Sequence, residues 1–143
     1  RKYNKVQMID KEIIKIASNT ENHGVLNNHT HSSKLKNGLC GDEMIIYLIL
    51  QEGTIKDFKY ECESCIYCQA SVSLLSRKAK NKPIDKIKVF AKQAKKSFQN
   101  KKNSFGKEWK EFDNIMTKNN ISRKECLLLP IKTTLDAINK KKL

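Results

Sequence analysis

The chain has 143 residues, of which 38% are hydrophobic and 31% charged, a size and composition typical of one globular domain with a modest core. No apolar run approaches the roughly 20 residues that a membrane-spanning helix needs, so a membrane protein is not expected. The net charge of +14 would suit a nucleic-acid partner. However, the lysines mostly fall where helices would face water and do not alternate with aromatic residues, which disfavours nucleic-acid binding.

Cysteine usage indicates the kind of chemistry to expect. The sequence starts at Arg1 without a recognisable signal peptide, so we expect a cytoplasmic protein, or an organellar one whose leader has been removed. Five cysteines, three of them between Cys62 and Cys68, favour metal or thiol chemistry over disulfides in such a compartment.

The first predicted element is a helix over residues 6–17, where apolar residues recur at helical spacing. A polar segment that ends in Gly24 stops it. Residues 25–36 are weakly patterned and could hold one short strand. The three histidines, His23, His29 and His31, lie nearby and could share a metal, but the polar residues around them favour a plain loop.

A turn over residues 37–41 contains two glycines and is expected to bring Cys40 and Asp42 to one point. Residues 42–50 then predict a mostly buried strand, residues 51–54 a hairpin turn, and residues 55–62 the returning strand. Cys65 follows that strand and precedes a helix predicted over residues 66–80. The dipole at the start of this helix favours a thiolate.

The remainder is predicted to be helical. After a break at residues 81–83 comes an amphipathic helix over residues 84–98, then a basic linker over residues 100–104 and a weaker helix over residues 105–116. Trp109 in that weaker helix is expected to be core rather than a platform for a ligand. Cys126 is expected just before a last helix, because Pro130 is tolerated only in a first turn.

Four residues are the candidate ligands of one site: Cys40, Asp42, Cys65 and Cys126. Three thiolates and a carboxylate would close a tetrahedral zinc site. They would equally hold a small iron–sulfur cluster, in which the oxygen atom is the most weakly bound ligand.

These motifs resemble those of the U-type iron–sulfur cluster assembly scaffolds, the family of IscU, SufU and the NifU N-terminal domain. Three matches occur in order along most of the chain. They are Cys40-Gly41-Asp42, then Cys65 with the A-S-V-S-L-L stretch at residues 70–75, and then Arg123-Lys124-Glu125-Cys126 before Leu-Leu-Pro and a final helix. The long segment before Cys126 is similar to the SufU branch, which has an insertion there. Glu125 stands where the IscU branch has a histidine, and the Leu-Pro-Pro-Val-Lys chaperone motif of that branch is not found before Cys126.

The resemblance implies an α+β fold of the SufE/NifU type, with a small, mostly antiparallel three-stranded sheet packed on one face by helices. We expect these to be the helices that start near Ile66, Ile84 and Leu127. We expect one domain over residues 1–143 with a helical insertion around residues 81–122. The implied function is that of a scaffold rather than an enzyme. It accepts sulfur from a cysteine desulfurase on Cys40, Cys65 and Cys126, assembles a [2Fe–2S] cluster with Asp42 as the fourth ligand, and transfers the cluster to acceptor apo-proteins.

Three alternatives remain open from the residues. The SufU branch often carries zinc, so the chain could instead be a zinc-bound sulfur acceptor that activates a desulfurase. A small basic zinc protein associated with nucleic acid would use the C-x-x-C spacings among Cys62, Cys65 and Cys68, but it lacks a second ligand pair. A thiol oxidoreductase would use Cys65 and Cys68, although no alternating strand–helix pattern surrounds them. Otherwise Cys62 and Cys68 are buried or spare thiols.

Overall fold

The computed structural model describes residues 11–38, 41–99 and 105–140. In chain order its elements are α2 (Lys11–Ala17), β1 (His31–Lys36), β2 (Glu43–Gln51), β3 (Thr54–Glu63), α3 (Ile66–Ala79), α4 (Ile84–Ser97), the 3-10 helices η1 (Lys107–Asn114) and η2 (Lys118–Arg123), and α5 (Lys124–Asn139). The predicted α+β class is confirmed. The first five residues of the predicted helix 6–17 and the expected linker 100–104 lie outside the described residues.

The sheet is antiparallel throughout, in the order β1-β2-β3. Side chains along β2 alternate between fully buried and half-buried, because successive residues of a strand point to opposite faces. Met44, Ile46 and Leu48 form the buried row. A two-residue turn joins β2 to β3, and both of its residues have positive φ, 52° at Glu52 and 74° at Gly53. This conformation matches the twist of a hairpin and explains why glycine occupies position 53.

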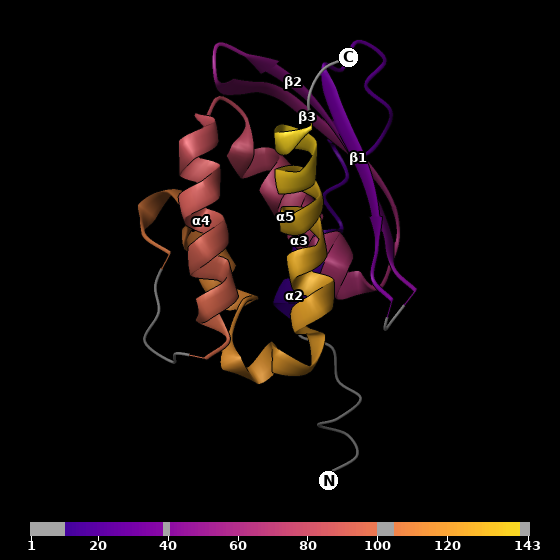
Figure 1. The fold of residues 1–143 in the computed structure, drawn as a ribbon. Coiled ribbons are helices and arrows are strands. Elements are labelled where there is room, and N and C mark those ends of the chain that lie inside the picture. The colour runs from indigo at the N-terminus through magenta and orange to yellow at the C-terminus, as the bar shows by residue number, and fades with distance from the viewer. Residues whose placement is uncertain (1–10, 39–40, 100–104, 141–143) are drawn as a thin grey trace, which may run out of the picture.

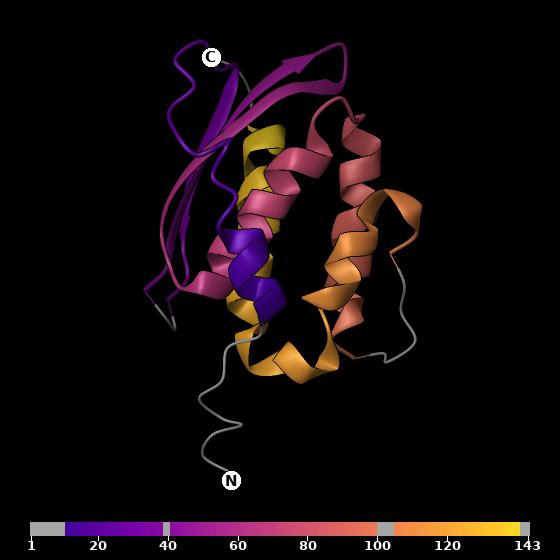
Figure 2. The same ribbon diagram turned by 180° about the vertical axis from the view of Figure 1, so that it is seen from behind.

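Helices cover one face of the sheet in layers. α3 and α5 lie side by side and pack against the strands, α5 on β1 and β2 and α3 on β3 (Figure 1). α2 packs on α3, as the view from behind shows (Figure 2). The helix that starts at Ile84 was expected to cover the sheet as well, but α4 packs mainly against α5, farther from the strands. No helix in the described part of the chain is long and apolar enough to cross a bilayer.

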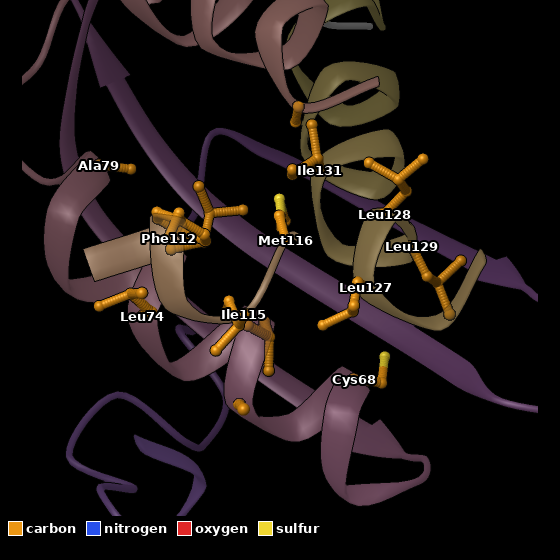
Figure 3. Packing of buried hydrophobic residues seen from close by; sticks show 14 of the residues in the cluster. Cys68, Leu74, Ala79, Phe112, Ile115, Met116, Leu127, Leu128, Leu129 and Ile131 are labelled. Carbon is orange, nitrogen blue, oxygen red and sulfur yellow. The ribbon is translucent and has the colours of Figure 1, made fainter. Parts of the chain in front are cut away.

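The core continues from the sheet through α3 and α5, and Figure 3 shows Phe112, Ile115 and Met116 among side chains of these two helices. It also includes an aromatic cluster. The Trp109 ring stacks on the Phe90 ring of α4 with 4.2 Å between the centroids. Phe105 and Phe112 complete the cluster. Trp109 is only 5% exposed, so its prediction as a core residue is confirmed.

The C-terminal helices differ from the predictions in two respects. The weaker helix predicted over residues 105–116 is a 3-10 helix over residues 107–114, kinked at Trp109. Trp109, Phe112 and Ile115 recur every three residues, and this spacing puts all three on one side of a helix with three residues per turn. The last helix begins at Lys124, so Cys126 lies inside its first turn and Pro130 lies deeper in the helix. Proline there removes only the hydrogen bond from position 130 to the Cys126 carbonyl, and burial of the helix on α3 and the sheet stabilises the rest.

Candidate metal centre

Three segments far apart in the sequence meet at the end of the sheet where β2 begins. They are the turn before β2, the start of α3 and the first turn of α5. They contribute Asp42, Cys65 and Cys126, and one ligand atom from each lies within 4.8 Å of the other two. This is the only group of three such ligands within residues 11–38, 41–99 and 105–140. The fourth predicted ligand, Cys40, lies outside the described residues.

Asp42 is held by the turn before it and by the start of α3. The turn closes through backbone hydrogen bonds from Gly41 N–H to the Asn37 carbonyl and from Asn37 N–H to the Asp42 carbonyl, 2.9 and 2.8 Å long. Gly41 adopts a φ of 73°, which suits glycine. One carboxylate oxygen of Asp42 accepts the backbone N–H of Cys65 at 3.1 Å. The carboxylate therefore faces the start of α3, and Asp42 is only 5% exposed.

The spacing of the ligand atoms fits a metal ion. The other carboxylate oxygen of Asp42 lies 3.7 Å from the Cys65 Sγ. Zinc bonds of about 2.1 Å to oxygen and about 2.3 Å to sulfur, arranged as a tetrahedron, put two such ligands about 3.6 Å apart. Two soft sulfurs with one hard oxygen suit zinc or iron, and an all-oxygen ion such as calcium or magnesium is a poor match.

Asn37 is a residue of the site that sequence reasoning treated only as part of a turn. Cys126 is 1% exposed, and the side-chain amide of Asn37 donates to its Sγ at 3.9 Å. N–H groups directed at sulfur are typical of metal thiolates, where they tune the ligand and fix its orientation. No local sequence pattern predicts this role, because Asn37 and Cys126 are 89 positions apart in the chain.

The small residues of the A-S-V-S stretch fix α3 against its neighbours and so position Cys65 relative to Cys126. The buried Ser71 hydroxyl donates to the Leu127 carbonyl of α5 at 2.7 Å. The Ser73 hydroxyl donates to the Asn19 carbonyl after α2 at 2.6 Å. At the start of α3, the Arg123 guanidinium lies 5.1 Å from the centre of the Tyr67 ring. This cation–π contact joins the starts of α3 and α5.

The remaining thiols lie beside the group of three ligands. The four described cysteines form no disulfide. Burial raises the pKa of the Cys68 thiol far above its ordinary value, and Cys68 is 0% exposed. Cys62 is half-buried, and burial also raises the pKa of its thiol. Cys68 is therefore buried, and it lies outside the group of three ligands.

No described histidine belongs to the ligand group. The His29 Nδ1 lies 2.6 Å from the Leu26 carbonyl, and the His23 ring packs edge-on against Tyr60. Glu125 points elsewhere as well. Its carboxylate pairs with the Lys132 ammonium at 2.8 Å, and this hydrogen bond holds the pKa of Glu125 below its ordinary value.

A hollow of about 420 Å³ opens next to the site, between the end of β1 and the first turns of α5. Its lining includes Asn37, so it adjoins the residue that contacts the Cys126 sulfur. The rest of the lining is two lysines, one glutamate, two leucines and one glycine: Lys36, Lys132, Glu125, Leu35, Leu129 and Gly38.

Comparison with known proteins gives consistent findings. The family described as NifU-like N terminal domain matches residues 8–118. The iron-sulfur cluster assembly scaffold protein IscU of Thermotoga maritima is 29% identical over 133 residues, which cover 93% of this chain and 94% of that protein.

Solved structures agree on the fold. The N-terminal NifU-like protein from Brucella abortus has a TM-score of 0.84 at 22% identity, with 90% of each chain covered. FiSufU from Fervidobacterium islandicum, described as a cluster assembly scaffold for the SUF system, has a TM-score of 0.80 at 25% identity. That match covers 92% of this chain and 96% of FiSufU.

Proposed function

The chain belongs to the family of NifU-like N-terminal domains, a family of scaffolds for iron–sulfur cluster assembly, and from this we propose what its cysteine site does. The protein accepts sulfur from a cysteine desulfurase, combines it with iron into a [2Fe–2S] cluster, and transfers the cluster to acceptor apo-proteins. The ligands are Cys40, Asp42, Cys65 and Cys126. We also propose that residues 1–143 form one domain in which residues 81–122 are an insertion.

One observation carries the proposal, namely that Asp42, Cys65 and Cys126 bring their ligand atoms within 4.8 Å of one another. They come from three elements that only the fold brings together, and each is a position at which the chain resembles the scaffold family. Cys40 is two residues before Asp42 in the sequence and is the natural source of a fourth ligand. Cysteine thiolates attack the sulfur of a persulfide, so the same residues that bind metal would also receive sulfur.

The compact spacing supports a second candidate function. Ligands of a single ion all lie within about 4 Å of one another, whereas a two-iron cluster divides its ligands between two ions. The mutual distances of all three described ligand atoms, within 4.8 Å, therefore suit one zinc ion. On this alternative the protein is a zinc-bound sulfur acceptor that activates its desulfurase.

The experiment that separates the two functions measures iron, zinc and acid-labile sulfide after anaerobic purification, before and after incubation with iron, cysteine, a dithiol reductant and a cysteine desulfurase. A scaffold gains iron and sulfide in equal amounts together with visible absorption. A zinc-bound acceptor keeps one zinc, gains no sulfide, and increases the turnover of the desulfurase. If the protein binds neither metal and does not affect the desulfurase, both candidates are wrong.

Asn37→Ala is expected to lower zinc affinity about tenfold, because groups that orient a metal ligand typically contribute 10–100-fold to affinity. The backbone hydrogen bonds of the turn do not involve the Asn37 side chain, so the turn itself is retained. Competition with a chromophoric chelator measures the affinity. Asn28→Ala, at an exposed loop position, is the control that should bind like the wild type. Equal affinity of the Asn37 and Asn28 variants would show that the amide has no such role.

A further inference from the structure

Cys68 follows Cys65 by one turn of α3, and we propose that it is the resolving thiol for sulfur carried on Cys65. Its thiol reduces a persulfide on Cys65 and releases the outer sulfur as hydrogen sulfide, the oxidation state that a cluster requires. This inference rests on the proposed function, because Cys65 must first receive sulfur.

The register of α3 brings the two residues together. Cys65 is the N-cap of the helix and Cys68 is the third residue inside it. Residues three apart at a helix start lie on one face, with Cα atoms roughly 5–6 Å apart, and a disulfide spans a Cα separation of roughly 4.4–6.8 Å. Figure 3 shows Cys68 pointing from α3 toward the first turns of α5, the segment that contains Cys126.

The thiols of Cys65 and Cys68 differ in their exposure to solvent. Uptake of sulfur requires an accessible thiol, and the later release of sulfide requires one that only Cys65 can reach. Cys65 is half-buried and has the carboxylate of Asp42 beside it, so a sulfur donor reaches it from the surface. Cys68 is 0% exposed and lies in the apolar core. An external thiol or disulfide has no path to Cys68, and the nearby Cys65 is the partner that its sulfur meets.

The buried Ser64 hydroxyl provides the group that a reacting Cys68 thiolate needs. It has no hydrogen-bond partner of normal geometry among the described residues. It nevertheless lies near the thiols of both Cys68 and Cys62, and it lowers the pKa of each against the effect of burial. A donor kept free beside a thiolate stabilises the thiolate when it forms.

The reaction balances without an external oxidant. The Cys68 sulfur attacks the inner sulfur of the Cys65 persulfide, a bond forms between Cys65 and Cys68, and the bond to the outer sulfur breaks. The outer sulfur leaves with the bonding electron pair as hydrosulfide and takes up the proton that Cys68 loses. Hydrosulfide is the conjugate base of a stronger acid than an alkyl thiol, so it is the better leaving group. An external dithiol then reduces the disulfide and restores both thiols.

The test loads the full-length, metal-free protein with sulfur from glutathione persulfide under anaerobic conditions. Excess reagent is removed, and sulfide release without added thiol is followed over time, with peptide mapping of the product by mass spectrometry. We expect the wild type to release its bound sulfur as sulfide and to form a disulfide between Cys65 and Cys68. Cys68→Ala should keep the extra sulfur on Cys65 and release sulfide at least about tenfold more slowly. Cys62→Ala, the matched control, should behave like the wild type.

Two results would overturn the inference: equal sulfide release by Cys68→Ala and wild type, or a wild-type disulfide that joins Cys65 to Cys40, Cys62 or Cys126. If Cys65 takes up no sulfur in any variant, the proposed sulfur acceptance is itself wrong. This outcome differs from sulfur uptake without a role for Cys68, in which only the resolving role is wrong. Zinc affinity of Cys68→Ala reports whether its site is intact. If this variant does not fold, the disulfide mapped in the wild type decides the question alone.

Discussion

Cys126→Ala is expected to lower the affinity of the site for zinc at least about 100-fold and to abolish reconstitution of a cluster. The variant removes a thiolate that lies within 4.8 Å of both other described ligand atoms. Loss of a group that only orients a ligand already costs about 10–100-fold in affinity, so loss of the ligand itself costs more. Chelator competition measures zinc affinity, and visible absorption after anaerobic incubation with iron and sulfide measures the cluster.

The fold should survive this substitution. Cys126 is 1% exposed, and truncation of a buried side chain by one sulfur leaves a small cavity that costs about 1–2 kcal/mol of unfolding free energy. Bound zinc should raise the melting temperature of the wild type and leave that of Cys126→Ala unchanged.

Cys62→Ala is the matched control, because Cys62 lies next to the site but outside the ligand group. It should bind zinc like the wild type. Zinc retained by Cys126→Ala and lost by Cys62→Ala would instead support a C-x-x-C zinc protein and contradict the convergent site.

Much of the fold follows from local patterns in the sequence. The alternation along β2, and the Gly53 turn after it, predict the hairpin to within a residue or two at each end. The predicted helices over residues 66–80 and 84–98 match α3 and α4, because each has a continuous apolar side and a clear break at residues 80–83. These elements needed no information from distant parts of the chain.

The C-terminal elements depend on tertiary contacts and were predicted poorly. The polar stretch 118–123 contains no buried residue, yet it forms η2, which leads directly into α5. Pro130 suggested a later helix start, but burial of Leu127 and Ile131 stabilises α5 on both sides of the proline. Local propensity cannot anticipate such burial.

The candidate ligands could be chosen from the sequence, but their surroundings could not. Cysteine and aspartate are recognisable types, and the order of the motifs resembles that of a known family. The amide of Asn37 on Cys126 and the Ser71 hydroxyl on the Leu127 carbonyl are polar contacts between distant segments. Asparagine and serine are common in turns and helices for local reasons, so their type does not reveal these roles.

Asp42→Cys is expected to slow transfer of a reconstituted cluster to an acceptor apo-protein at least about tenfold. A hard carboxylate oxygen binds iron less firmly than a thiolate does, so it is the ligand that exchanges most readily. A fourth thiolate would hold the cluster more tightly. Circular dichroism of the acceptor's cluster follows the transfer rate, and the same measurement without acceptor follows spontaneous loss.

A second variant separates the ligand role of Asp42 from its structural role. The carboxylate also accepts the Cys65 N–H at 3.1 Å, and Asp42→Cys removes this bond. Asp42→Asn keeps an oxygen that can accept the N–H but weakens the ligand. If ligand strength controls release, Asp42→Cys slows transfer while Asp42→Asn speeds it or prevents stable assembly. If the hydrogen bond controls release, Asp42→Cys speeds transfer and Asp42→Asn resembles the wild type. This second pattern, or transfer unchanged in Asp42→Cys, would contradict a labile carboxylate ligand.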